Sequence, residues 1–246
     1  MAKKRLIPKL LIKKGGYKNT QNVVVRTKNF LNPIQIGEVV SQAKIFQDQI
    51  ADELVILRID KNISFENLLQ MTNAIADEVF MPITIGGNID SEEKIKELLS
   101  NGADKVSINT EVHRNPNLLR KASHHFGSST IVVSIDYKIE SDGRAIVYSE
   151  NGTNKTTKNL IEWAKEVERL GAGEILLSCI DRDGTRNGLD LKFASLVKTN
   201  VKTPIVLSGG CGLSSHFVEG FSKTGVSGIS AGTFFALQDQ NFIQTR

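Results

Sequence analysis

The sequence predicts an α/β protein, a single (β/α)8 TIM barrel built from two repeated half-barrels. Short β-branched runs alternate with amphipathic stretches along the chain, as in βα units around a parallel sheet. The chain has 246 residues, close to the ~250 residues of a closed eightfold barrel. An open doubly wound sheet is the alternative.

Eight runs are predicted to be strands. They are short and apolar or β-branched, and helix-like segments separate most of them. The predicted strands are residues 5–11, 53–59, 82–86, 105–109, 130–136, 174–180, 204–208 and 228–232.

Amphipathic segments between the strands are predicted to be helices. In SEEKIKELLSNGA, Ile95, Leu98 and Leu99 fall on one helical face and Gly102 follows as a stop. NPNLLRKASHHFG and TTKNLIEWAKEVERLGAG have the same form. No Pro/Ser/Gly-rich linker divides the chain, so we expect one domain over residues 1–246, with half-barrels at about 1–125 and 126–246.

An internal repeat supports the barrel. GGNIDSEEKIKELLSNGADKVSINT starts at Gly86 and GGCGLSSHFVEGFSKTGVSGISAGT at Gly209, an offset of 123 residues (209 − 86). At a similar offset of 125 (136 − 11), Leu11 corresponds to Asp136. These two residues should therefore lie on opposite sides of the barrel mouth, the C-terminal face where such barrels place their chemistry.

Composition narrows the function classes. No apolar run reaches the ~18 residues of a membrane span, and the start MAKKRLIPKLLIKK is a poor secretory signal, so we expect a cytoplasmic protein without a membrane partner. Two cysteines and four histidines show no ligand spacing, so no metal or cofactor is expected. The net charge of +4 favours anionic substrates. The sequence has no basic run interleaved with aromatic residues, so a nucleic-acid partner is not expected.

Glycine pairs recur at equivalent strand ends, Gly86-Gly87 and Gly209-Gly210. The next strand ends at 109–110 in one copy and at 232–233 in the other. Glycine lets backbone N–H groups approach an oxyanion, and a following helix N-terminus adds a favourable dipole. Two phosphate cradles would fit an elongated bisphosphorylated ligand; tight βα turns are the alternative.

Two aspartates are candidate acid/base groups. Asp136 follows an apolar run, where partial desolvation would raise its pKa and suit a general base. Asp183 lies in SCIDRDGTRNG, a predicted mouth loop, as an acid/base or as a group that orients ligand hydroxyls. For both, a carboxylate that only caps a loop or turn is the alternative.

Charged residues begin four of the predicted strands, where a barrel usually has apolar filler. Two cations and two anions could form a neutral ring at the barrel floor, since unpaired charges there would be costly. Taken alone, the pattern fits ordinary surface charges better. The four are Arg5, Glu53, Lys105 and Glu174.

Together, KRLIPKLLIKKG, NGADKVSINT, GAGEILLSCIDRDGT and TPIVLSGGCG resemble the cyclase subunit of imidazole glycerol phosphate synthase over nearly the whole chain. The resemblance implies a bisphosphorylated ribulosyl aminoimidazole carboxamide nucleotide at the mouth, and a class I glutaminase at the opposite face whose ammonia crosses the barrel. It implies that Asp136 is catalytic, that Asp183 lies beside the substrate, and that Asp104 faces the glutaminase. The implied phosphate-site residues are Gly87, Asn109, Thr110, Ser208, Gly209, Gly210, Ala231 and Gly232. The implied ammonia gate is the ring Arg5, Glu53, Lys105 and Glu174.

Three departures from the family pattern change the expectation. Leu11 stands where the family has its first catalytic aspartate. Arg58 replaces an acidic residue at the end of the second strand, and Asn88 replaces a glycine of the phosphate loop. Arg58 is expected to attract an anionic group at the mouth. Leucine cannot transfer protons, so one of the two acid/base groups is missing. With this departure the chain resembles second-copy paralogues in surface-polysaccharide loci. In those loci a glutaminase and barrel pair supplies ammonia to a separate sugar amidotransferase. The alternatives are an active cyclase/lyase of histidine biosynthesis, with Asp183 or another acid substituting, and a phosphosugar isomerase.

Overall fold

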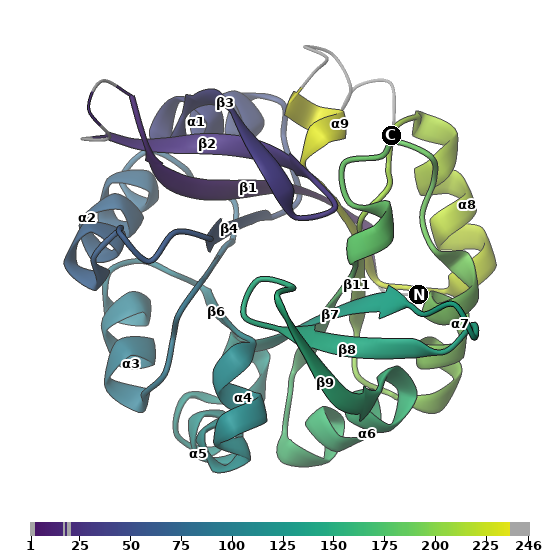
Figure 1. The fold of residues 1–246 in the computed structure, drawn as a ribbon. Helices are drawn as coiled ribbons and strands as arrows, with labels where there is room; N and C mark the ends of the chain where they lie inside the picture. Colours follow the sequence, from purple (N-terminus) through teal and green to yellow (C-terminus); the bar gives the residue numbers. More distant parts are fainter. Residues whose placement is uncertain (1–2, 17, 19–20, 237–246) are drawn as a thin grey trace.

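Eight parallel strands close into a barrel in the computed structural model, which describes residues 3–16, 18 and 21–236 (Figure 1). Each strand pairs in parallel with the next, and the last pairs with the first. The barrel strands are β1 (Arg5–Gly15), β4 (Leu54–Arg58), β5 (Ile83–Gly86), β6 (Lys105–Ile108), β7 (Ile131–Ile139), β10 (Glu174–Cys179), β11 (Ile205–Ser208) and β12 (Gly228–Ala231). The predicted (β/α)8 fold is confirmed.

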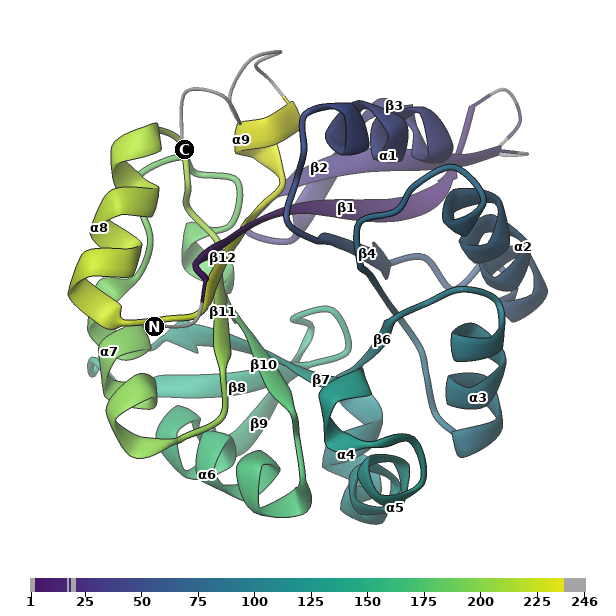
Figure 2. The same cartoon turned by 180° about the vertical axis from the view of Figure 1, so that it is seen from behind.

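Helices surround the barrel on the outside (Figures 1 and 2). The longer ones are α1 (Val39–Asp48), α2 (Phe65–Ala76), α3 (Glu92–Ser100), α5 (Pro116–Phe126), α6 (Leu160–Leu170), α7 (Leu191–Asn200) and α8 (Ser214–Thr224). The shorter ones are α4 (Thr110–Arg114), α9 (Thr233–Ala236) and the 3-10 turns η2 (Ser128–Thr130) and η3 (Ile180–Arg182). Within the described part of the chain, no helix is long and apolar enough to cross a bilayer.

Two β-hairpins that the sequence analysis did not predict extend the barrel. β2 (Gln21–Lys28) and β3 (Leu31–Glu38) follow β1, while β8 (Ala145–Ser149) and β9 (Asn154–Asn159) follow β7. Pairing with β2 and β8 carries β1 and β7 beyond their predicted ends at residues 11 and 136. The hairpins occupy equivalent places in the first and fifth barrel strands, as the repeat would require.

Leu11 and Asp136 occupy matching positions in these two strands. Leu11 lies opposite Val25 of its hairpin, and Asp136 lies opposite Tyr148 of the other. Four strand-to-strand steps separate β1 from β7 in either direction around the barrel. The predicted opposition of the two residues across the mouth is therefore present. The division into half-barrels near residue 125 stays a prediction, and residues 1–2, 17, 19–20 and 237–246 of the expected single domain lie outside the described residues.

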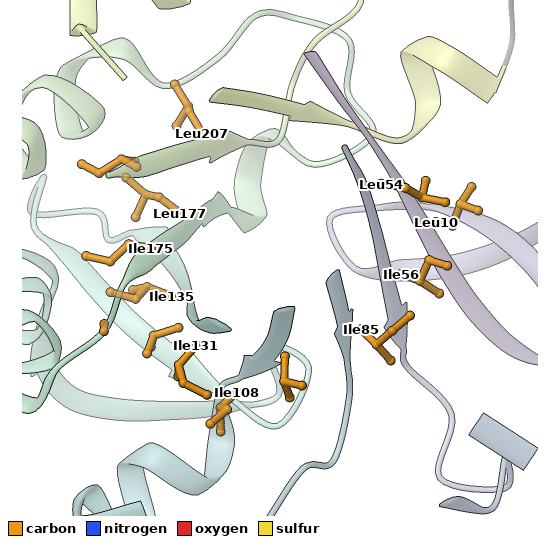
Figure 3. Packing of buried hydrophobic residues seen from close by; sticks show 14 of the residues in the cluster. Leu10, Leu54, Ile56, Ile85, Ile108, Ile131, Ile135, Ile175, Leu177 and Leu207 are labelled. Atoms are coloured by element: carbon orange, nitrogen blue, oxygen red, sulfur yellow. The ribbon is translucent and has the colours of Figure 1, made fainter. Parts of the chain in front are cut away.

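The core has two layers because alternate strand residues face opposite sides of the sheet. Outward residues such as Leu10, Ile56 and Ile175 pack against the helices (Figure 3). A smaller inner layer fills the barrel lumen and consists of Ile7, Val55, Val132, Leu176 and Val206. The inner face of β1 therefore presents a charge, an apolar residue, a charge and an apolar residue in succession, at Arg5, Ile7, Lys9 and Leu11.

Candidate functional site

The two glycine pairs lie in tight turns at the ends of β5 and β11. Gly87 has φ +112° and Gly210 has φ +107°, values that side-chain-bearing residues rarely adopt. A methyl group on Gly87 would lie 2.2 Å from the Arg58 carbonyl oxygen, and one on Gly210 would lie 2.1 Å from that of Gly188. Both turns therefore require glycine for backbone angle and for space.

Gly210→Ala is expected to destabilise the protein more than a matched glycine substitution. Gly225 also has positive φ (+71°), but an added methyl would meet no atom within 4 Å. Gly225→Ala should cost about 1–2 kcal/mol from its backbone angle, and Gly210→Ala about 1–3 kcal/mol more from overlap. Urea unfolding of both variants measures the difference. Equal losses would contradict the close packing at Gly210.

Five predicted phosphate-site residues line one cavity at the second glycine turn. Lys9 and Asp183 line the same cavity, together with Gly184, Cys211 and Thr233. We call the five residues the β11–β12 cradle: Ser208, Gly209, Gly210, Ala231 and Gly232. The structure thus brings this half of the predicted phosphate site together beside an aspartate; phosphate binding stays a prediction.

The other predicted phosphate site is braced by Arg58. Its Nε and Nη2 donate to the Gly87 carbonyl oxygen at 3.1 and 2.7 Å, and its Nη1 donates to that of Ile63 at 2.7 Å. Burial lowers the pKa of this guanidinium. Backbone carbonyls therefore hold the guanidinium in place, and the expectation that Arg58 attracts an anionic group at the mouth stays a prediction. Asn88 takes φ +57°, a left-handed angle that asparagine tolerates better than most residues.

Asn109 and Thr110, the remaining members of that site, are engaged within the protein. Asn109 Nδ2 donates to Asp136 Oδ2 at 2.7 Å. Thr110 Oγ1 accepts the backbone N–H of Glu150 at 3.0 Å. Asn109 therefore orients the candidate catalytic carboxylate, while Thr110 ties β6 to the second hairpin.

Asp136 is a buried carboxyl whose pKa is raised to about 7. Burial is the main cause; the nearby charge of Lys9 and hydrogen bonds from Asn109 and Ser178 oppose it. A group with this pKa is present in both protonation states near neutral pH, which suits a general acid or base. Desolvation at the end of an apolar run was expected to raise the pKa of Asp136, and the structure agrees with this expectation. The catalytic role stays a prediction.

Asp183 faces into the barrel rather than capping its own turn. Its Oδ2 accepts from Thr27 Oγ1 at 2.8 Å, and its Oδ1 lies 3.4 Å from Lys9 Nζ. Sequence reasoning missed both partners. Lys9 had a usable signal, because it is the charged residue inside an apolar strand and shares the inward period of Arg5. Thr27 had none, because only the hairpin brings it to the mouth.

An apolar cluster occupies the mouth at Leu11. Leu11, Val23 and Val25 are buried together, with Leu57 and Ile59 packed against them. β2 supplies two of these side chains, so the hairpin covers the position where the family pattern has an aspartate. No proton can be exchanged by the side chains of this cluster.

The four charged residues at the strand starts form a closed ring at the barrel floor, which we call the floor ring. Arg5 Nη1 lies 2.6 Å from Glu53 Oε1, and its Nη2 pairs with Glu174. Lys105 Nζ lies 3.2 Å from Glu53 Oε2 and 2.9 Å from Glu174 Oε2. Burial lowers the pKa of Arg5, but Glu174 and Glu53 outweigh that effect and raise it above its usual value. The reading as separate surface charges is therefore wrong.

Asp104 lies at the same end of the barrel, immediately before β6. Its side chain accepts the Ile83 N–H at 2.8 Å and the residue is exposed to solvent. It is thus fixed by a local hydrogen bond and accessible to a partner.

The residues that the structure describes contain no group of three or more His, Cys, Asp or Glu side chains that could hold a metal ion.

The fold and the site define a barrel protein with a floor ring beneath an acid-containing mouth. The profile of the family described as "Histidine biosynthesis protein" matches residues 5–240. The chain is 42% identical to the putative imidazole glycerol phosphate synthase subunit hisF2 of Prochlorococcus marinus, covering 100% of this chain and 95% of that protein. It is 41% identical to the subunit HisF of Hydrogenobaculum sp. (96% and 91% covered) and 38% identical to that of Streptococcus sanguinis (100% and 95%). The chain belongs to the HisF-type family of imidazole glycerol phosphate synthase subunits.

Proposed function

We propose that this chain is the barrel subunit of a glutaminase-dependent amidotransferase complex, and that ammonia enters through the floor ring. The closed, charge-neutral ring around the barrel axis is the observation that carries the proposal. Its partner would be a class I glutaminase at the face that carries Asp104, forming a heterodimer in the cytoplasm. Membership of the HisF-type family supports this partner, since such subunits work with a glutaminase.

The ammonia would then serve a separate sugar amidotransferase that converts an acetamido to an acetamidino group in surface-glycan synthesis. The apolar cluster at Leu11 supports this role, because it removes one of the two carboxylates that ring closure needs. The ligand of the mouth would be a bisphosphorylated nucleotide-like compound or a phosphosugar. Genomic neighbours that encode saccharide enzymes would favour this role.

The second candidate is an active cyclase/lyase in histidine biosynthesis. Asp183 favours it, because this carboxylate faces the mouth beside Lys9 while Lys9 also acts on Asp136. Asp183 could then replace the missing acid. Neighbouring genes for the other steps of histidine synthesis would favour this reading.

A charge reversal at Asp104 is expected to weaken glutaminase docking. Asp104→Lys removes the local hydrogen bond as well as the charge, whereas Asp104→Asn keeps an acceptor for Ile83. We expect a loss of about tenfold or more in affinity for Asp104→Lys, because it reverses the charge on the proposed interface, and a smaller loss for Asp104→Asn. Asp142→Lys, on the exposed turn between β7 and β8, is the control.

Titration of the purified barrel with the glutaminase from the same genome measures this effect. Complex formation by wild type and the Asp142 control, with weakened binding of Asp104→Lys, is the expected result. Wild-type affinity in Asp104→Lys would remove Asp104 from the interface. No complex with wild type would overturn the proposed heterodimer itself.

A further inference from the structure

Lys9 is a buried cation in the lumen between the inner apolar layer and the mouth. It follows Arg5 and Ile7 on the inward face of β1 and is 5% exposed. A lysine so deep is rarely kept without a polar partner, because removing an ammonium from water is costly. The contacts of the Lys9 ammonium group should therefore indicate its function.

The contacts of Lys9 with described residues leave donor capacity. Its Nζ donates to Ser208 Oγ at 2.9 Å and lies 3.4 Å from Asp183 Oδ1. The second distance is longer than the ~2.7–2.9 Å of a strong charge-assisted hydrogen bond. A lysine ammonium has three donors, so these two contacts leave one for another acceptor.

Lys9 also lies where an anion would be held. It lines the cavity formed by the β11–β12 cradle, and one of its own hydrogen-bond partners, Ser208, belongs to that cradle. The described residues around this cavity include one cation, Lys9, and one carboxylate, Asp183. Glycine N–H groups alone offer dipoles, whereas Lys9 adds a full charge beside them.

We propose that Lys9 is an oxyanion-binding residue of the mouth, donating to a phosphomonoester on the β11–β12 cradle in competition with Asp183. This inference rests on the phosphate site of the proposed function but is independent of ammonia transfer. Without ligand, Asp183 and Ser208 hold the ammonium. With ligand, a phosphate oxygen takes the remaining donor and weakens the long contact to Asp183.

Inorganic phosphate is the probe, and its affinity is measured by calorimetric titration of wild type and variants. Lys9→Met should bind phosphate about 10- to 100-fold more weakly, the loss expected for a charge-assisted hydrogen bond. Asp183→Asn should bind several-fold more tightly, because it removes the competing carboxylate and keeps Lys9. Lys61→Met, an exposed lysine after β4, should bind as wild type.

The variants separate the possible outcomes. Phosphate affinity unchanged in Lys9→Met, with wild type binding, would overturn the role of Lys9 and leave the cradle standing. Weaker binding in both Lys9→Met and Asp183→Asn would mean that the ion pair only maintains the shape of the cavity, and would also overturn the inference. No binding by folded wild type would overturn both the cradle and Lys9.

Discussion

In excess ammonium salt, the purified protein is expected to leave the bisphosphorylated ribulosyl aminoimidazole carboxamide nucleotide unchanged, whereas Leu11→Asp converts it. The new carboxylate would lie across the mouth from Asp136, whose pKa near 7 lets it give or take a proton. Restoring one general acid/base is typically worth about 10²- to 10⁴-fold in rate. Free ammonia removes any need for the glutaminase, so product formation reports the chemistry of the barrel alone.

Leu11→Asn is the matched control. Asparagine is a polar side chain of the same size as aspartate and would lie beside Val23 and Val25, but it cannot exchange protons. Both variants lose apolar packing, so their folding is checked by thermal unfolding before activity is compared. Turnover by wild type at a rate typical of its family would refute the proposal that ring closure has been lost. It would then favour Asp183 as the second acid.

The barrel could be predicted because its signals are local and repeated. The βα units repeat an apolar strand followed by an amphipathic helix, and several of these helices end in a glycine stop, as in the segment ending at Gly102. β2 and β8 contain apolar runs that could have indicated strands, whereas the outer hairpin strands lack such signals: β9 is wholly polar, and β3 contains Pro33 and is largely exposed. The strand conformation of β3 and β9 depends on pairing with β2 and β8, which in turn pair with the extended ends of β1 and β7. The sequence pattern does not encode this pairing locally.

The site could be predicted only where a residue's role depends on its own strand. The apolar run before Asp136 indicated desolvation, and its pKa is indeed raised. The contacts of Arg58 could not be predicted, because two of its carbonyl partners, Gly87 and Asn88, lie about 30 residues away in the chain. The floor ring joins residues up to 169 positions apart, so its four charges look like surface residues until the barrel closes.

Glu174→Gln is expected to destabilise the fold far more than removal of an exposed carboxylate. Glu174 contacts both cations of the floor ring, and its side chain is 8% exposed. The variant would leave Arg5 and Lys105 with one shared carboxylate, Glu53. Breaking a buried ion pair in this way costs about 3–5 kcal/mol, and we expect the lower end because the two cations keep some contact with water.

Glu162→Gln is the control, since Glu162 pairs with Lys165 on the surface of α6 with its side chain 73% exposed. Its loss should stay within about 0.5 kcal/mol. Urea unfolding of both variants at low and high salt gives the comparison, and screening should reduce the small surface term while leaving most of the floor-ring term. If Glu174→Gln cost no more than Glu162→Gln, water would already screen the ring. The floor would then lack the electrostatic closure that makes it a candidate gate for neutral ammonia.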